Sequence, residues 1–327
     1  MESKVVKKLR KLAVCSFMLG SVMLSTSSIA AEKATVYQAF QSILYLPLYV
    51  GMNEGIFDKE GLEVKKVTAS GGAQAVAAVV GGSADFSLGD PMTAVLANLK
   101  GGSTKAVAMV VSGVPAWVIV PKDSPIKSFA DISNQTFATA IPPSTTTYLF
   151  QNTLKEHKLT NVKLNTVQVG TELAPVQAGR ADGAVVYQPQ LEQAVSQGYR
   201  IVYDYAKQFH GVYEFSAIVT KTDTIKNKPA MVQKFVTGLA KAEKLMQSNP
   251  NLARSIARKE FPTLDPKVVD AAVDRMLAQN IYPATPEISQ AAFNNAINLQ
   301  ISIGNIKPGQ VAYHDAVDNS FAQKAVK

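Results

Sequence analysis

A run of four hydroxyl side chains follows two prolines in the stretch PPSTTTYLF, at positions 142–150. The stretch lies between a predicted strand and a predicted helix. The first turn of a helix has unpaired backbone N–H groups and a partial positive charge, so it can hold an anionic or strongly polar group. One N-cap needs one hydroxyl, and threonine is a mediocre helix former. We therefore interpret Ser144, Thr145, Thr146 and Thr147 as ligand contacts, with plain capping by Ser144 or Thr145 as the alternative.

Two further turns between a predicted strand and a predicted helix are candidates for ligand contact. In ASGGAQAV, the residues Ser70, Gly71 and Gly72 leave the backbone bare, although a tight turn would need the same residues. The stretch is neither the glycine fingerprint of a dinucleotide site nor a phosphate loop with its lysine. In SLGDPM, Asp90 precedes Pro91, which is also typical of an N-cap with proline at the first helical position.

Aromatic and polar residues near other strand ends complete the predicted site. Trp117 and Tyr187 occupy strand positions, where such side chains serve either as core or as stacking platforms. The other predicted contacts are Gln41, Ser42, Tyr45, Gln188 and Glu214.

The residues that would indicate an enzyme do not form a recognisable pattern. His157, His210 and His314 are far apart in sequence, and the chain has a single cysteine, Cys15, so we expect no zinc site. No serine nucleophile elbow is present. The sequence therefore predicts no catalytic residues, no metal and no cofactor.

Alternating strand and helix patterns must position these residues. Such an alternation predicts α/β units with mostly parallel sheets and helices on both faces. Parallel sheets bind ligands beyond the carboxyl ends of their strands, and ligand sites favour domain interfaces. The last third of the chain is predicted to be almost entirely helical. Strands are expected at 34–40, 62–68, 83–88, 105–111, 116–121, 136–141, 162–169, 183–187, 199–205 and 215–221, with helices including 46–57, 73–80, 92–99 and 144–157.

The N-terminus has the features of a secretory signal peptide. Five basic residues before position 12 precede an apolar run at 12–24, and small residues allow cleavage near Ala30 or Ala31. The apolar run is shorter than the roughly 20 residues that span a bilayer. Cys15 lies inside this segment, so the predicted mature chain has no cysteine, which suits an oxidising compartment. We expect the protein in a periplasm.

The charge of the mature chain is modest. The predicted signal carries five of the 33 basic residues and one of the 25 acidic residues, so the rest of the chain has a net charge of +4 instead of +8. The charges are interspersed, without the basic stripe of a nucleic-acid-binding surface. The sequence therefore predicts no nucleic-acid partner.

Several of these segments together resemble one family. They are LPLYVGMNEGIFDKEGLEV, VVGGSADFSLGDP, VIVPKDSPIKSFADI, STTTYLF and VYQPQ, which fall between residues 34 and about 221. In order and spacing they resemble the periplasmic solute-binding proteins of ABC importers, in the branch for nitrate, taurine, alkanesulfonates and pyrimidine precursors.

The resemblance implies the two-lobed, type II periplasmic-binding-protein fold, an α/β fold with a ligand cleft between the lobes and a helical C-terminal region. It also implies two chain crossings, near 112–116 and 209–215, that act as hinges. The implied partners are a small solute and the transmembrane subunits of a permease, and the implied state is a monomer. The expected parts are a signal peptide at 1–31, lobe 1 at 32–113, lobe 2 at 114–214 and a return to lobe 1 at 215–327.

The departures from the family pattern concern the solute. Taurine-type receptors commonly have histidine at the position of Thr147 and glutamate at that of Gln188, and no arginine occupies an obvious cleft position here. A sulfonate or nitrate-type anion and a pyrimidine-like compound therefore both stay open. The alternatives to a receptor are a pyrimidine-precursor-synthesising enzyme on the same fold, which needs a cysteine cluster, and a periplasmic sensor subunit.

Overall fold

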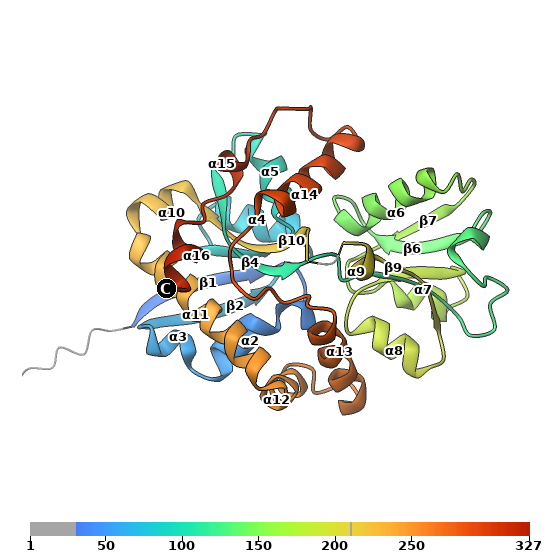
Figure 1. Ribbon diagram of the computed structural model, residues 1–327, viewed down its shortest axis with the longest axis horizontal. Helices are drawn as coiled ribbons and strands as arrows, with labels where there is room; N and C mark the ends of the chain where they lie inside the picture. The colour runs from blue at the N-terminus through green and yellow to red at the C-terminus, as the bar shows by residue number, and fades with distance from the viewer. Residues whose placement is uncertain (1–30, 210) are drawn as a thin grey trace, which may run out of the picture. The chain divides into compact units, whose positions relative to one another are not determined.

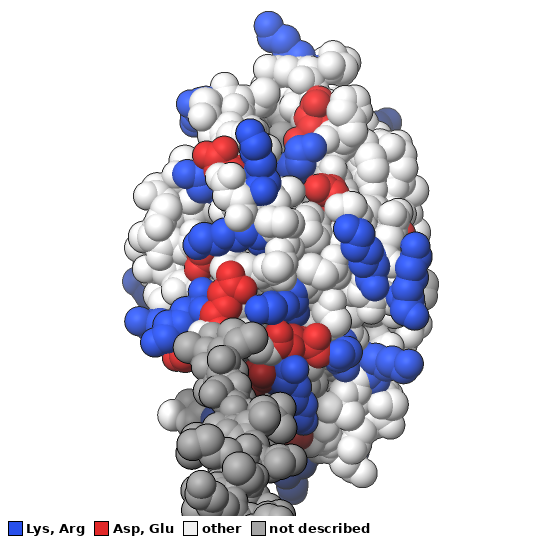
Figure 2. Space-filling model, turned by 90° about the vertical axis from the view of Figure 1, so that its left-hand side faces the viewer, with Lys and Arg blue, Asp and Glu red and all other residues white. Residues whose placement is uncertain are grey.

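Two mixed β-sheets, each covered by helices, organise residues 31–209 and 211–327, the part of the chain that this computed structural model describes (Figure 1). The predicted signal peptide with Cys15, and His210, lie outside the described residues. Within the described residues, no helix is long and apolar enough to cross a membrane. On the face shown in Figure 2, basic and acidic side chains are interspersed and form no basic stripe.

The first sheet has the strand order β2(Leu62–Thr68), β1(Glu32–Gln38), β3(Phe86–Gly89), β10(Glu214–Lys221), β4(Thr104–Ser112). β1 runs parallel to β2 and β3, whereas β10 is antiparallel to both β3 and β4. β3, β10 and β4 are almost wholly buried, as expected for strands that helices cover on both faces. We call this sheet and the helices that pack on it lobe 1; they are α2(Leu46–Asn53), α3(Ile56–Lys59), α4(Gly72–Val80), α5(Pro91–Asn98), α10(Thr222–Asn227), α11(Pro229–Ser248), α12(Pro250–Glu260), α14(Gln290–Ser302), α15(Tyr313–Ala316) and α16(Ser320–Ala325).

The second sheet has the same layout, with the order β7(Lys163–Val167), β6(Thr136–Ala140), β8(Gly183–Val186), β5(Trp117–Val120), β9(Arg200–Asp204). β6 is parallel to β7 and β8, and β5 is antiparallel to β8 and β9. We call this sheet lobe 2, together with its helices α6(Thr145–Glu156), α7(Leu173–Gln177), α8(Gln190–Ser196) and α9(Tyr205–Gln208). The reversed strand of each sheet is the one that arrives from the other lobe.

Every predicted strand overlaps an observed one, and the α/β class with two lobes is confirmed. One predicted helix is divided in the structure. The helix expected at 46–57 is split into α2 and α3, because Gly55 adopts a left-handed conformation with φ +60°. The short helices α9 and α10 had no clear signal in the sequence.

The two crossings between the lobes lie side by side. Gly113 N–H donates to the carbonyl of Tyr213 at 3.0 Å, and the Ser112 hydroxyl donates to the carbonyl of Gly211 at 2.9 Å. Gly113 and Gly211 have φ +76° and +67°, which glycine adopts without steric cost. One helix of the C-terminal region, α13(Pro266–Ala278), contacts α8 of lobe 2.

Tightly packed phenylalanine rings mark the core of each lobe. In lobe 1, Phe57 and Phe86 stack on Phe235, with ring centroids 5.1 and 4.2 Å apart. In lobe 2, the ring of Phe137 lies directly against Gly183 of β8, where no Cβ atom would fit. Glycine at that position is therefore a packing requirement of the second sheet.

Candidate ligand-binding site

A cavity of about 270 Å³ is lined by residues of both lobes. Most of the lining comes directly after the carboxyl ends of β1, β2, β3, β6, β7 and β8, where the α/β pattern predicts a ligand site. The lining consists of Ala39, Phe40, Tyr45, Ser70, Gly71, Gly72, Ala73, Asp90, Thr93, Ala140, Ile141, Pro142, Pro143, Ser144, Thr145, Gln168, Val169, Tyr187, Phe215 and Ser216.

Three helices begin at this cavity. Asp90 caps α5 by accepting the N–H of Met92 at 2.9 Å, so the predicted N-cap role is observed. α4 begins after Gly71 and α6 begins after Ser144, and neither N-cap residue makes a side-chain capping bond. The N-cap side chains therefore leave first-turn N–H groups of α4 and α6 available to a bound molecule, apart from the Thr145 N–H, which is directed at Asp90.

The four hydroxyl side chains at 144–147 make different hydrogen bonds. Ser144 shares a hydrogen bond of 3.1 Å with Thr146, whose hydroxyl is also 2.5 Å from the Tyr187 hydroxyl. Thr145 donates to the carboxylate of Asp90 across the cavity. Thr147 donates to the carbonyl of Ala140 at 2.6 Å. Only Ser144 and Thr145 line the cavity; Thr146 and Thr147 are buried behind it.

Asp90 is bound by hydrogen bonds from both lobes. Its carboxylate accepts from Met92 of its own helix and from Thr145 of lobe 2. Burial raises the pKa of Asp90 to about 6, and the hydrogen bonds from Thr145 and Met92 offset part of that effect. Asp90 can therefore change its charge close to neutral pH.

Aromatic side chains form the walls of the cavity. Phe40 of lobe 1 lies 5.5 Å from Tyr45 and 5.5 Å from Tyr187 of lobe 2, measured between ring centroids. The ring centroid of Phe215 lies 6.1 Å from that of Tyr187. A flat or apolar molecular body could pack against these rings.

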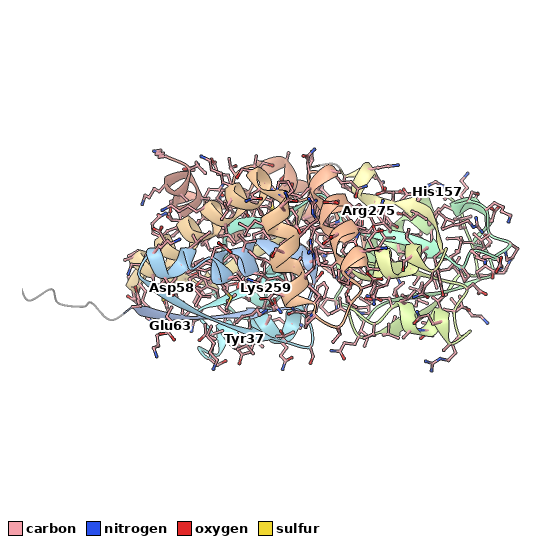
Figure 3. All side chains as sticks on the ribbon, turned by 90° about the horizontal axis from the view of Figure 1, so that it is seen from below. Tyr37, Asp58, Glu63, His157, Lys259 and Arg275 are labelled. Atoms are coloured by element: carbon pink, nitrogen blue, oxygen red, sulfur yellow. The ribbon has the colours of Figure 1, made fainter. Side chains whose placement is uncertain are left out.

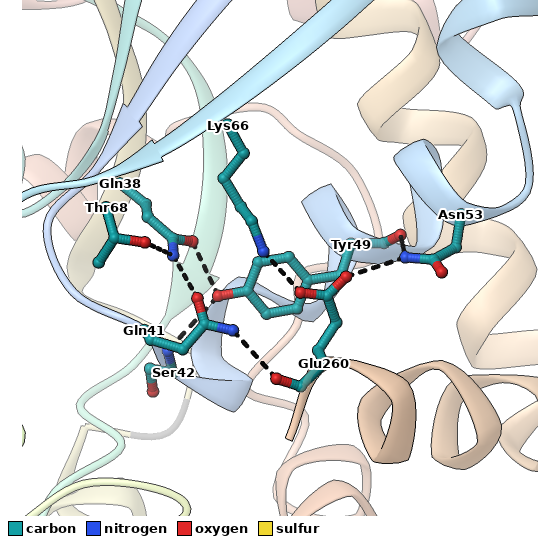
Figure 4. Close-up of polar contacts among 8 residues, drawn as sticks. All are labelled: Gln38, Gln41, Ser42, Tyr49, Asn53, Lys66, Thr68 and Glu260. Atoms are coloured by element: carbon teal, nitrogen blue, oxygen red, sulfur yellow. Dashed lines mark hydrogen bonds and ion pairs between the residues drawn. The ribbon is translucent and has the colours of Figure 1, made fainter. Parts of the chain in front are cut away.

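A polar network holds the loop that carries Phe40 and Tyr45 (Figure 4). Gln38 donates to the side-chain oxygen of Gln41 at 2.5 Å, and Gln41 donates to the carbonyl of Glu260 at 3.4 Å. The Glu260 carboxylate in turn pairs with Lys66 at 2.5 Å, and the Lys66 ammonium lies 4.2 Å from the centre of the Tyr49 ring. The structure thus places Gln41 outside the cavity lining, in a network that positions the loop.

Several other predicted contacts also lie outside the lining. Trp117 is fully buried in β5 because both faces of the second sheet are covered. Ser42 caps the 3-10 helix η1(Ile43–Tyr45) and donates to the carbonyl of Gln188 of lobe 2 at 2.6 Å. The Gln188 amide donates to Glu192 at 3.1 Å. Glu214 begins β10, and its carboxyl group has no hydrogen-bond partner among the described residues.

The lining includes residues that sequence reasoning missed. Phe40, Gln168 and Val169 are the last residues of two predicted strands and lie just beyond the observed ends of β1 and β7, so the strand ends themselves pointed to them. Phe215 and Ser216 lie within β10 directly after Glu214, which was the predicted contact of this strand but does not line the cavity.

Contacts between the lobes extend beyond the cavity. Arg275 of α13 forms an ion pair with Glu192 of α8, and the Gln279 amide donates to Asp204 at 3.2 Å. Figure 3 shows Arg275 on the helical region next to lobe 2. Together with the bond from Ser42 to Gln188 and the bond from Thr145 to Asp90, these contacts join the two lobes on both sides of the cavity lining.

A second buried carboxyl group, Glu172, makes stability depend on pH. Burial raises the pKa of Glu172 to about 7, although Gln190 at 2.7 Å and the Gly170 N–H at 3.0 Å donate to it. The folded state thus favours the protonated carboxyl group of Glu172. This preference stabilises the fold fully when the pH is below the ordinary pKa of glutamate, and the stabilisation is lost as the pH rises through about 7. We expect Glu172→Gln to reduce the fall in the free energy of unfolding between pH 5 and pH 8 by about 2.5 kcal/mol.

Urea denaturation at the two pH values measures this difference. The matched control is Asp182→Asn, an exposed carboxylate that accepts one backbone N–H, from Thr136 at 2.7 Å. An unchanged pH dependence in Glu172→Gln would show that this carboxyl group does not titrate in that range.

Comparison with known proteins gives a family and a fold. A family model described as NMT1/THI5 like matches residues 43–253. A curated relative is YtlA of Bacillus subtilis (strain 168), named as a candidate binding protein, which is 20% identical over 302 residues that cover 89% of each chain.

Solved structures share the two-lobed fold at low identity. The alkanesulfonate-binding protein SsuA of Xanthomonas axonopodis pv. citri, bound to MOPS, has a TM-score of 0.72 and 17% identity, covering 89% of this chain and 99% of that chain. The periplasmic nitrate-binding protein NrtA of Synechocystis PCC 6803 has a TM-score of 0.71 and 14% identity, covering 90% and 88%. The desulfurization enzyme DSZB has a TM-score of 0.67 and 14% identity, covering 90% and 99%.

Proposed function

Because this chain belongs to the NMT1/THI5-like family, we propose that it is an extracytoplasmic solute-binding receptor of an ABC importer. In this role it captures a small polar solute between its lobes and delivers the solute to the transmembrane subunits of a permease. It acts as a monomer in the periplasm after its signal peptide is cleaved near Ala30 or Ala31. The solute classes kept open by the sequence are a sulfonate or nitrate-type anion and a pyrimidine-like compound.

The observation that carries this proposal is the shared lining of the cavity. Phe40 and Asp90 belong to lobe 1, Thr145 and Tyr187 belong to lobe 2, and direct contacts join the two sets. A molecule held by all four is released only when the lobes separate, and the paired glycines of the crossings, Gly113 among them, allow that rotation. This is the physical requirement for a receptor that holds its solute until it meets a partner.

The rival function is an enzyme on the same two-lobed fold. Among the described residues that line the cavity there is no cysteine, histidine, lysine or arginine. The side chains that line it are hydroxyl, amide, aromatic or aliphatic apart from Asp90. This composition supports binding without conversion. Mass spectrometry of a solute recovered from the protein distinguishes the two functions, because a receptor returns it unchanged.

Solute binding should close and stabilise the protein. At a free concentration of about 100 times the dissociation constant, a solute adds roughly 2.7 kcal/mol to the free energy of unfolding. In a chain of this size that corresponds to roughly 2 to 4 °C in melting temperature per kcal/mol. The measurement is a melting curve with small-angle scattering on the same sample, after addition of a small-molecule extract of the source cells. A melting shift without compaction would contradict closure, and the absence of any shift would contradict the receptor function.

A further inference from the structure

Asp90 is the one charged side chain among the described residues that line the cavity. Its carboxylate accepts hydrogen bonds from the Met92 N–H and from the Thr145 hydroxyl, and the Thr145 backbone N–H is a further donor to it. An ionised carboxylate offers about four lone-pair sites, so further donors can still bind it. Asp90 is only partly buried by the protein because one side of it faces the cavity.

A solute that is only an anion fits this arrangement poorly. It would lie in a cavity about 270 Å³ in volume together with the Asp90 carboxylate, and the described lining supplies no cationic side chain. The N–H groups at the starts of α4 and α6 contribute partial charges only, each end amounting to roughly half an elementary charge. Like charges at short distance inside a protein repel more strongly than in water.

The same lining suits a molecule that carries a donor nitrogen. Its N–H groups would meet the free lone pairs of Asp90, while hydrogen-bond acceptors elsewhere on it would face the first turns of α4 and α6. Its body would lie against the rings of Phe40 and Tyr187. Charge-assisted hydrogen bonds of this kind are the stronger class in proteins.

We propose that the solute carries an amino, amidino or similar N–H donor group that pairs with Asp90, on a flat and largely apolar body, and that simple anions are not its class. This inference rests on the proposed receptor function and narrows its solute. Asp90 is then both the N-cap of α5 and the residue that selects the solute.

The surroundings of Asp90 make this recognition depend on pH. The other titratable groups that face Asp90 are Tyr45, Tyr187, Tyr213 and Glu214. Burial raises the pKa of each tyrosine, so all three stay neutral. Burial also raises the pKa of Glu214 well above its usual range, so Asp90 is the group that ionises near neutrality. A cationic solute should therefore bind more tightly as pH rises, and an anion should show the opposite trend.

Three probes of matched size and shape test the inference: benzamidine as a cation, benzamide as a neutral donor and benzoate as an anion. Calorimetric titration at pH 5 and pH 7 should show binding of benzamidine that is about tenfold tighter at pH 7, because the ionised fraction of a group with a pKa of about 6 rises by that factor. Benzamide should bind more weakly than benzamidine, and benzoate should not bind at pH 7.

The variant Asp90→Asn should bind benzamidine roughly 10- to 100-fold more weakly and lose the pH dependence, since the charge-assisted bond is gone. Asparagine is a good N-cap, so α5 should stay intact. The matched control is Asp265→Asn, because Asp265 also caps a helix just before a proline, accepting from Lys267 at 2.8 Å, and is not part of the cavity lining.

Two results would overturn the inference. One is binding of benzoate or inorganic nitrate at pH 7 that equals or exceeds that of benzamidine. The other is benzamidine binding that is absent in the wild type or equal in wild type and Asp90→Asn. An extract solute that binds but lacks nitrogen removes this inference and leaves the receptor function standing, whereas failure of every extract to bind removes the receptor function itself.

Discussion

Replacing Arg275 with alanine is expected to weaken the contact between the lobes by about 2 to 3 kcal/mol. Arg275 pairs with Glu192, whose side chain is only 6% exposed, whereas that of Arg275 is 30% exposed. Removing the cation leaves a carboxylate buried without its counter-charge, which is costly in a way that an exposed ion pair is not. This expected loss of stability is smaller than that for a fully buried ion pair, because the Arg275 side chain is partly exposed to water.

The effect should reach the ligand cavity. Glu192 also accepts the side-chain amide of Gln188, and Gln188 directly follows Tyr187 in the cavity wall. We therefore expect Arg275→Ala to increase the radius of gyration in scattering without solute and to weaken solute binding. Addition of Glu192→Gln to this variant should restore most of the stability, since it removes the unpaired charge.

The control for Arg275 is Arg258→Ala. Arg258 pairs with Asp270 at 2.7 Å between α12 and α13, and both side chains are substantially exposed, 44% and 31%. Its loss should cost less than about 1 kcal/mol. Equal behaviour of the two alanine variants in urea denaturation would show that Arg275 does not hold the lobes together.

The substitution Gly183→Ala is expected to destabilise lobe 2 by about 3 kcal/mol. A Cβ atom at position 183 would lie 2.5 Å from the carbonyl oxygen of Ile119 and would overlap the ring of Phe137. The Ile119 oxygen belongs to β5, which pairs with β8, so it cannot retreat without disturbing the sheet. Loss of soluble expression or a lower urea midpoint would show the effect.

Gly81→Ala is the comparison for this substitution. Gly81 ends α4 with ordinary helical angles, φ −75° and ψ −10°, and a Cβ there would come no closer than 3.2 Å, to the Ala77 carbonyl oxygen. The cost should stay within about 1 kcal/mol, because the conformation suits an alanine. Equal stability of Gly183→Ala and Gly81→Ala would mean that the second sheet can relax around the added methyl group.

Local sequence patterns predicted the strands and helices of this fold, but they did not predict which strands pair with each other over long distances in the sequence. Alternation and glycine punctuation mark the strands and helices, so Gly71 and Asp90 were correctly placed between strand and helix. The insertion of β10 between β3 and β4 joins residues far apart in sequence, and no local signal encodes it. The sequence pointed to Glu214 at the start of this strand, but only the long-range pairing shows that its neighbour Phe215 lines the cavity.

The hydroxyl run shows a similar limit at the level of side chains. Its position at the start of a helix beside the cavity was predictable from the neighbouring strand and prolines. Which hydroxyl faces the cavity depends on partners supplied by other elements, such as Asp90 for Thr145 and Tyr187 for Thr146. Composition alone could not separate Ser144 and Thr145, which line the cavity, from Thr147, which is bonded to the Ala140 carbonyl.

The place of β10 also fixes the order in which the two sheets can form when the N-terminal part of the chain emerges first. The strands of lobe 2 all lie between residues 117 and 204, whereas the first sheet lacks its inner strand until residue 221 is available. A chain that emerges from its N-terminus can therefore complete lobe 2 while β3 and β4 still have unpaired edges next to each other. Unpaired strand edges invite association with other chains, and contacts between distant segments form slowly. The interval before β10 arrives is thus the one in which this protein is most exposed to aggregation, and it is where a folding chaperone would have the most effect.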